Sequence, residues 1–142
     1  MNDSFNLARF VEAQARDYAQ AIAELRAGRK TTHWIWYVLP QLRGLGSSTY
    51  ATHYGIASLD EARAYLAHPV LGQRLLACVA AMNEHHGVSA VQILGSIDAA
   101  KFRSCLTLFL AVDPDNAMLR EALDKYYDGV RDEKTLSLLR AS

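Results

Sequence analysis

The sequence has 142 residues, of which 51% are hydrophobic and 21% are charged. This length and balance are typical of one globular domain, and they exclude a disordered or fibrous chain. Lysine plus arginine number 15, as do aspartate plus glutamate, so the formal net charge is zero. We therefore expect no binding to nucleic acid, because no overall positive field attracts a phosphate backbone.

Three features bear on where the protein works. No apolar run approaches the roughly 20 residues that span a bilayer, so we expect no membrane insertion. The first residues include Asp3 and lack the apolar stretch of a signal peptide. Cys78 and Cys105 lie in apolar helical patterns, where a reduced thiol packs as a small hydrophobic group. We therefore expect a cytoplasmic protein that needs no disulfide, metal or cofactor.

The first part of the chain predicts one long helix and then shorter elements. Apolar residues recur at helical spacing from Phe5 to Leu25, which indicates an amphipathic helix. Residues 32–40 are apolar on every side, so a buried helix and a buried strand both fit. We favour the helix, because no second strand candidate exists to pair with it. Residues 41–55 contain three glycines and predict a loop that leads into a short helical turn near Ser47 or Ser48.

The rest of the chain has clear helix starts. Ser58 with Glu61, and Ser89 with Gln92, have the capping-box spacing. Asp98 is a candidate cap for a helix whose core positions follow the helical repeat without exception. These positions are Phe102, Cys105, Leu106, Phe109 and Leu110. Further helices follow after residues 113 and 132. We predict an all-α fold, a single compact multihelical domain over residues 1–142 with about seven or eight helices.

Several short segments are distinctive. They are Gly28-Arg29-Lys30, His33-Trp34-Ile35-Trp36, Pro40-Gln41, Gly44-Leu45-Gly46-Ser47, Glu61-Ala62, Tyr65-Leu66, His68-Pro69-Val70-Leu71-Gly72, Asp98, Lys101-Phe102 and Thr107-Leu108-Phe109. In these residues the chain resembles a bacterial family of mainly helical proteins of unknown function, whose members are sometimes labelled calpastatin in genome files. The resemblance implies the multihelical fold and no activity. Nothing in the chain resembles a disordered protease inhibitor rich in proline and charge.

The aromatic segment is the first candidate site. His33, Trp34, Trp36 and Gln41 place an imidazole, two indole N–H donors and an amide within one apolar stretch. Buried polar groups need hydrogen-bond partners, so the segment either satisfies them within the core or lines a pocket. An apolar wall with a few polar groups is typical of small-molecule sites. Both interpretations stay open.

A second candidate is the loop after this segment. Arg43 is followed by two glycines and by Ser47 and Ser48, just before a predicted helix start. Free N–H groups at a helix start and a nearby arginine bind phosphate or carboxylate groups. The pattern matches neither a Walker loop nor a dinucleotide fingerprint, so a solvated turn also fits. We state an anion site from Arg43 to Ser48 as a hypothesis.

The third candidate lies on the core helix. Asp98, Lys101 and Ser104 are spaced by three residues and therefore neighbour one another on the helix. A lysine can activate an adjacent serine as a nucleophile. We prefer a cap, an ion pair and a packing serine, because no oxyanion-stabilising group is identifiable. Lys101 is nevertheless kept as a candidate ligand-binding residue.

Metal and thiol chemistry are not expected. The histidines lack the spacing of the H-E-x-x-H zinc motif, and the two cysteines are far apart in sequence. Both thiols lie on predicted core faces, where a raised pKa makes a cysteine unreactive.

These observations predict a domain that binds a small anionic molecule, such as a phosphate or a nucleotide-like compound, or a partner protein. The alternatives are a hydrolase or transferase acting on a phosphorylated or nucleotide-like substrate, and a structural protein that assembles with itself. A pocket where Trp36, Gln41, Arg43 and Lys101 converge favours the first two, whereas a large exposed apolar patch favours the third. The sequence leaves open whether the protein is a homo-oligomer.

Overall fold

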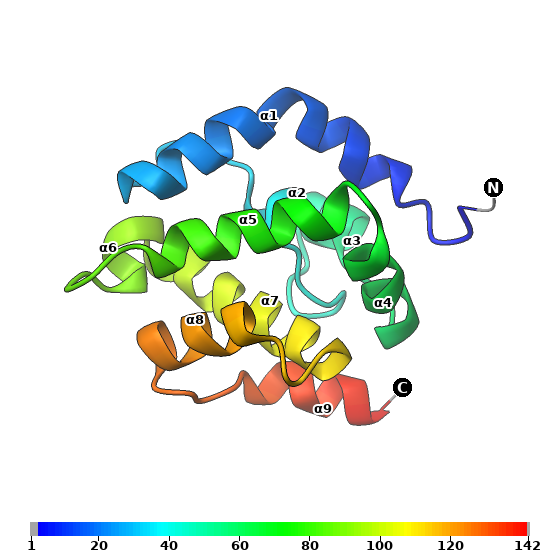
Figure 1. The fold of residues 1–142 in the computed structure, drawn as a ribbon. Coiled ribbons are helices and arrows are strands. Elements are labelled where there is room, and N and C mark those ends of the chain that lie inside the picture. The colour runs from blue at the N-terminus through cyan, green and yellow to red at the C-terminus, as the bar shows by residue number, and fades with distance from the viewer. Residues whose placement is uncertain (1–2, 142) are drawn as a thin grey trace.

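The computed structural model describes residues 3–141 and consists of helices joined by short loops (Figure 1). This range contains nine helices and no strand, apart from an isolated parallel bridge between Leu42 and Ile56. The all-α prediction is therefore confirmed. The helices are α1 (Ala8–Ala27), α2 (Ile35–Val38), α3 (Thr49–Tyr54), α4 (Leu59–Ala67), α5 (Leu71–Asn83), α6 (Ala90–Leu94), α7 (Ser96–Val112), α8 (Ala117–Tyr127) and α9 (Glu133–Ala141).

The predicted number of seven or eight helices is slightly wrong for the part of the chain that the structure describes. Two of the nine helices are very short, since α2 has 4 residues and α3 has 6. A helix of this length has no detectable 3.6-residue pattern, and it is not stable alone in water. Packing of α2 against α1 and α3 stabilises both short helices.

α5 and α7 are the central helices. α5 packs against α1, α4 and α8, whereas α7 packs against α4, α6, α8 and α9. In the view of Figure 1, α1 crosses above α5, and α8 and α9 lie below it. Within residues 3–141, none of the helices combines the length and the apolar character that crossing a membrane requires.

The best-patterned predicted helix corresponds to α7, and its core prediction is confirmed. Phe102, Leu106 and Phe109 have no exposed surface. The ring centroid of Phe109 lies 5.4 Å from that of Tyr65, which in turn lies 5.0 Å from that of Phe10. Aromatic rings from α1, α4 and α7 thus meet in one buried cluster, where each contributes a large apolar area.

The predicted cap of α7 is wrong. The helix begins at Ser96, directly after Gly95, whose φ of 86° is a conformation that glycine adopts without strain. Asp98 lies in the first turn, and its carboxylate binds the Lys30 ammonium at 2.8 Å. No side chain caps the first N–H groups of α7.

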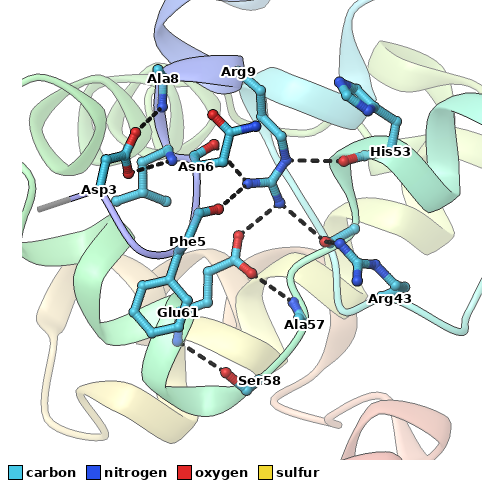
Figure 2. A network of polar contacts seen from close by, with 12 residues as sticks. Asp3, Phe5, Asn6, Ala8, Arg9, Arg43, His53, Ala57, Ser58 and Glu61 are labelled. Carbon is cyan, nitrogen blue, oxygen red and sulfur yellow. Dashed lines mark hydrogen bonds and ion pairs between the residues drawn. The ribbon is translucent and has the colours of Figure 1, made fainter.

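A buried ion pair joins the start of α1 to α4 (Figure 2). Arg9 Nη2 lies 2.7 Å from Glu61 Oε2, and the two side chains are 7% and 3% exposed. Glu61 Oε1 accepts a hydrogen bond from the N–H of Ala57 at 2.9 Å. The guanidinium also donates to the backbone carbonyls of Phe5, Asn6, His53 and Gly55. Both charges are therefore paired and hydrogen-bonded, as stable burial requires.

Phe109→Ala should lower the free energy of unfolding by about 3–5 kcal/mol, because it removes a fully buried ring and leaves a cavity. Ile97→Ala is the control, since Ile97 is 72% exposed on the same helix. Urea unfolding of both variants is the measurement. A loss below about 1 kcal/mol for Phe109→Ala would contradict the packing described above.

Arg9→Met should lower the free energy of unfolding by about 3–5 kcal/mol, because Glu61 would keep a buried and unpaired charge. The double variant with Glu61→Leu should recover part of that loss, since no buried charge remains. Arg63→Ala serves as control: its exposed pair with Asp60 on α4 contributes about 0–1 kcal/mol. Equal losses for Arg9→Met and Arg63→Ala in urea unfolding would show that the buried pair contributes no more than the exposed one.

Candidate functional site

Trp34 is a core residue whose polar group is satisfied. It is 1% exposed, and its Nε1 donates to Glu24 Oε1 at 3.0 Å. The Lys30 ammonium lies over the indole, 5.0 Å from the ring centroid. Glu24 also accepts hydrogen bonds from Gln20, Thr31 and Thr32. One buried carboxylate of α1 thus organises the backbone that leads into α2.

The chain beyond α2 returns on itself and carries α3. The N–H of Ile56 donates to the carbonyl oxygen of Gln41 at 3.0 Å, and the N–H of Arg43 donates to that of Ile56 at 2.7 Å. Gly55 permits this approach, because a Cβ there would lie 2.8 Å from the Arg43 Cα. The bridge holds Gln41 beside α2 and α3, which is where the first cavity lies.

This cavity has a volume of about 10 Å³, which is room for one water-sized group. Trp36, Gln41 and Lys101 line it, so the structure brings these three candidates together. The Lys101 ammonium lies 5.0 Å from the Trp36 ring centroid, and Tyr50 packs edge-on against the same indole. Trp36 Nε1 is buried without a hydrogen-bond partner among the described residues. The other lining residues are Ile35, Leu39, Tyr50, Ala51, Tyr54 and Gly55.

A larger groove of about 600 Å³ adjoins the cavity, since Gln41 and Lys101 line both. Its walls come from the loop before α3, from α6, from the first half of α7, from the end of α8, and from the segment around the start of α9. The other lining residues are Leu45, Gly46, Val91, Ser96, Ile97, Ala99, Ala100, Arg103, Ser104, Tyr127, Asp132 and Lys134. We call the cavity and the groove together the cleft.

The cleft is rich in positive charge. Lys101, Arg103 and Lys134 line the groove, against the single carboxylate of Asp132 among its described lining residues. Asp132 is already engaged, because it accepts hydrogen bonds from Ser104 and from the N–H of Thr135 at the start of α9. The groove therefore has more cationic groups than free anionic ones.

These cations differ in how they are held. The Lys101 ammonium lies 3.9 Å from the Asp98 carboxylate, so the attraction between them is weak. The closer partner of Asp98 is Lys30, at 2.8 Å. Arg103 donates through Nε to the carbonyl oxygen of Val130 at 2.7 Å and keeps its other N–H groups for further contacts. Lys134 is exposed and has no recorded ion pair within residues 3–141.

The start of α7 adds partial positive charge to the same groove. Ser96 and Ile97 line it, and the first turn of this 17-residue helix has no side-chain cap. Free N–H groups at a helix start favour a nearby anion. The contribution is secondary to the side-chain cations, because water also reaches this end.

The structure places the other predicted site residues away from the cleft lining. His33 is exposed, and its carbonyl oxygen accepts a hydrogen bond from the Tyr37 hydroxyl. Arg43 donates through Nη2 to the carbonyl oxygen of Gly55 at 3.1 Å. Ser47 is exposed and is not among the residues that line the groove. Ligand binding by these three residues stays a prediction.

Sequence reasoning missed Arg103, Asp132, Lys134 and Tyr127 as cleft residues. Arg103 is two residues from Lys101, but nothing in the pattern shows that α8 and α9 fold back beside α7. The packing of α7 against α8 and α9 creates this wall of the groove. The information that places these residues in the cleft is therefore tertiary rather than local in the sequence.

Neither cysteine is part of the cleft. Burial raises the pKa of Cys78 to about 12, and burial raises the pKa of Cys105 as well. Neither thiol lines the cavity or the groove. A thiol of raised pKa is a poor nucleophile, so the candidate chemistry rests on nitrogen and oxygen groups.

The fold and the cleft define a small multihelical protein with a cationic groove beside an aromatic cavity. The chain belongs to the family described as "Protein of unknown function (DUF1810)", whose model matches residues 4–139. It is also similar to a crystal structure of the conserved hypothetical protein Rv1873 from Mycobacterium tuberculosis. The two are 48% identical with a TM-score of 0.96, and the match covers 99% of this chain and 100% of the other. The comparison with curated proteins gives no match. The resemblance to a mainly helical family of unknown function is thus confirmed.

Glu24→Gln tests the anchor under the aromatic segment. Burial alone would raise the pKa of Glu24, but hydrogen bonds from Thr32, Gln20 and Thr31 outweigh it and hold this pKa well below its usual value. The variant leaves buried donors unpaired, so the free energy of unfolding at neutral pH should fall by about 2–4 kcal/mol. A lowered pKa in the folded state means that this stabilisation is complete above the unfolded pKa of about 4.3 and is lost as the pH falls.

The difference between wild type and Glu24→Gln should therefore shrink between about pH 6 and about pH 3. Urea unfolding across this range is the measurement. Glu12→Gln is the control on α1, because Glu12 is exposed and should matter by less than about 0.5 kcal/mol. A difference that stays constant with pH would contradict the role of the Glu24 carboxylate.

Proposed function

We propose that the cleft binds a small oxyanionic molecule, such as a phosphorylated or nucleotide-like compound or a carboxylate. One observation carries the proposal. Lys101, Arg103 and Lys134 come from two helices and line one groove, whose described lining includes a single carboxylate that is already hydrogen-bonded. Concave sites with converging cationic groups are the places where small anions bind.

The charges in the rest of the chain show that this cluster of cations is a local feature. The chain as a whole has no net charge, so a general positive field does not explain it. Arg9 pairs with the buried carboxylate of Glu61 at 2.7 Å, and Lys30 pairs with the partly buried carboxylate of Asp98 at 2.8 Å. Among the described residues, Lys101 has a carboxylate only at 3.9 Å, and no ion pair joins Arg103 or Lys134 to a carboxylate, so an anionic ligand would supply a closer partner.

The groove has enough volume for a molecule larger than a free ion. Its volume of about 600 Å³ falls within the range of small-molecule sites. Leu45, Val91 and Ile97 provide apolar lining beside the cations. This combination suits a molecule with an anionic group and an apolar or aromatic body.

One contact supports the enzymatic alternative, a hydrolase or transferase on the same class of compound. Ser104 Oγ donates to Asp132 Oδ2 at 3.0 Å in the groove, and a carboxylate so placed can accept a serine proton. Lys101 instead contacts Trp36 and Asp98, so the lysine-activated serine considered from the sequence has no direct contact in its favour. Release of phosphate or of an alcohol from phosphate esters, lost in Ser104→Ala, would identify this activity.

Lys101→Gln and Lys134→Gln should each weaken the binding of adenosine monophosphate or pyrophosphate by about tenfold, because each removes one charge-assisted contact. Isothermal calorimetry at low salt measures the affinity. A rise in melting temperature with ligand concentration gives an independent readout. Added salt should weaken binding to the wild type, because it screens the charges.

Two control variants make the test specific. Arg29→Gln removes an exposed cation that does not line the cleft, so affinity should be unchanged. Arg43→Ala separates the cleft from the loop hypothesis, because loss of binding in this variant alone would favour an anion site from Arg43 to Ser48. Equal affinities for wild type and both lysine variants would refute binding in the groove.

A further inference from the structure

The second indole of the aromatic segment has a buried hydrogen-bond donor without an acceptor. Trp36 Nε1 is shielded from solvent and has no partner among the described residues. The Nε1 of Trp34, two residues earlier, is bonded to Glu24. An unpaired buried donor costs about 1–3 kcal/mol, and buried donors in proteins are rarely left in this state. Such a group needs an acceptor from outside the described residues.

The residues that line the cavity beside Trp36 indicate the chemical nature of that acceptor. Trp36 and Lys101 can only donate hydrogen bonds, and no carboxylate is among the residues that line this cavity. The complementary group is therefore an oxygen that accepts and carries negative charge. The ammonium of Lys101 lies over the indole face, which places a full positive charge 5.0 Å from the centroid of the ring that carries the donor.

Size limits the occupant further. About 10 Å³ holds one water-sized group, so a single oxygen enters and the rest of its parent group stays outside. Gln41 and Lys101 line both the cavity and the groove, so the two spaces adjoin at these side chains. An oxyanion at Lys101 can place one oxygen in the cavity while the molecule to which it belongs lies in the groove.

We propose that Trp36 Nε1 is the specificity-determining donor of the cleft, and that it binds one oxygen of a carboxylate or phosphoryl group at the end of a larger molecule. This inference rests on the proposed binding function, and it adds which protein atom recognises the anionic group of the ligand. A neutral analogue without the oxyanion would leave the buried donor unpaired, and sites of this kind discriminate strongly against such analogues.

Nuclear magnetic resonance of the two indole N–H groups in the whole chain tests the inference. The Trp36 signal is assigned by its absence in Trp36→Phe. Adenosine monophosphate and benzoate should move the Trp36 proton signal downfield, because a new hydrogen bond deshields it. Adenosine and benzyl alcohol, which lack the oxyanion, should not move it. The Trp34 signal is the internal control, since its N–H is already bonded to Glu24.

The two oxyanions separate the phosphoryl from the carboxylate source, and inorganic phosphate tests whether the body of the ligand is needed. Trp36→Phe should weaken binding of the responding oxyanion by about tenfold in calorimetry. Circular dichroism shows whether this variant is folded, and the wild-type titration stands even when it is not.

Two negative results have different meanings. Calorimetric binding of an oxyanion to wild type with a stationary Trp36 signal, and an equal affinity in folded Trp36→Phe, would overturn this inference and leave the binding function intact. Absence of binding by adenosine monophosphate, benzoate and inorganic phosphate would overturn both. A signal that moves equally with adenosine would show that Trp36 reads the body of the ligand rather than its charge, and would also overturn the inference.

Discussion

The buried pair of Arg9 and Glu61 is the constraint on which the rest of the structure depends. The segment between α1 and α4 contains two helices too short to be stable alone, so its polar backbone groups need partners from elsewhere. α1 supplies them from three buried side chains. Glu24 binds the backbone before α2, Gln14 donates to the carbonyl oxygen of Tyr37, and Arg9 donates to those of His53 and Gly55. The pairing of Arg9 with Glu61 offsets the desolvation penalty of the buried guanidinium charge, and it also holds α4 against α1.

The cleft follows from this arrangement. Because Glu24 holds the chain before α2 and Arg9 holds the chain after α3, the short segment between them presents Trp36 and Gln41 in a defined position. α7 is packed into the molecule through its buried core side, and it brings Lys101 to the same place. A site built on packed helices is more precise than one built on mobile loops.

The charged residues divide into two groups with different roles. Arg9, Glu24, Lys30 and Asp98 are paired or hydrogen-bonded inside the molecule, where they connect helices. Lys101, Arg103 and Lys134 line the groove, and the close carboxylate at Lys101 is taken by Lys30. Lys30 and Lys101 both lie near Asp98. Lys30 forms the closer ion pair, and Lys101 lines the cleft. Neutral overall charge conceals this local excess.

The sequence by itself determined the helical class, several helix starts such as those at Ser58 and Ser89, and the core of α7, because capping patterns and helical periodicity are local. It also named Trp36, Gln41 and Lys101. It left open whether Trp34 and Trp36 satisfy their donors in the core or line a pocket, and the structure gives each a different answer. Glu24 accepts a hydrogen bond from Trp34, whereas no acceptor among residues 3–141 bonds to Trp36 Nε1. The positions of Arg103 and Lys134 in the groove were beyond the sequence, since they depend on which helices pack together. Local pattern sets the elements, whereas tertiary packing decided which polar groups find partners among the described residues and which do not.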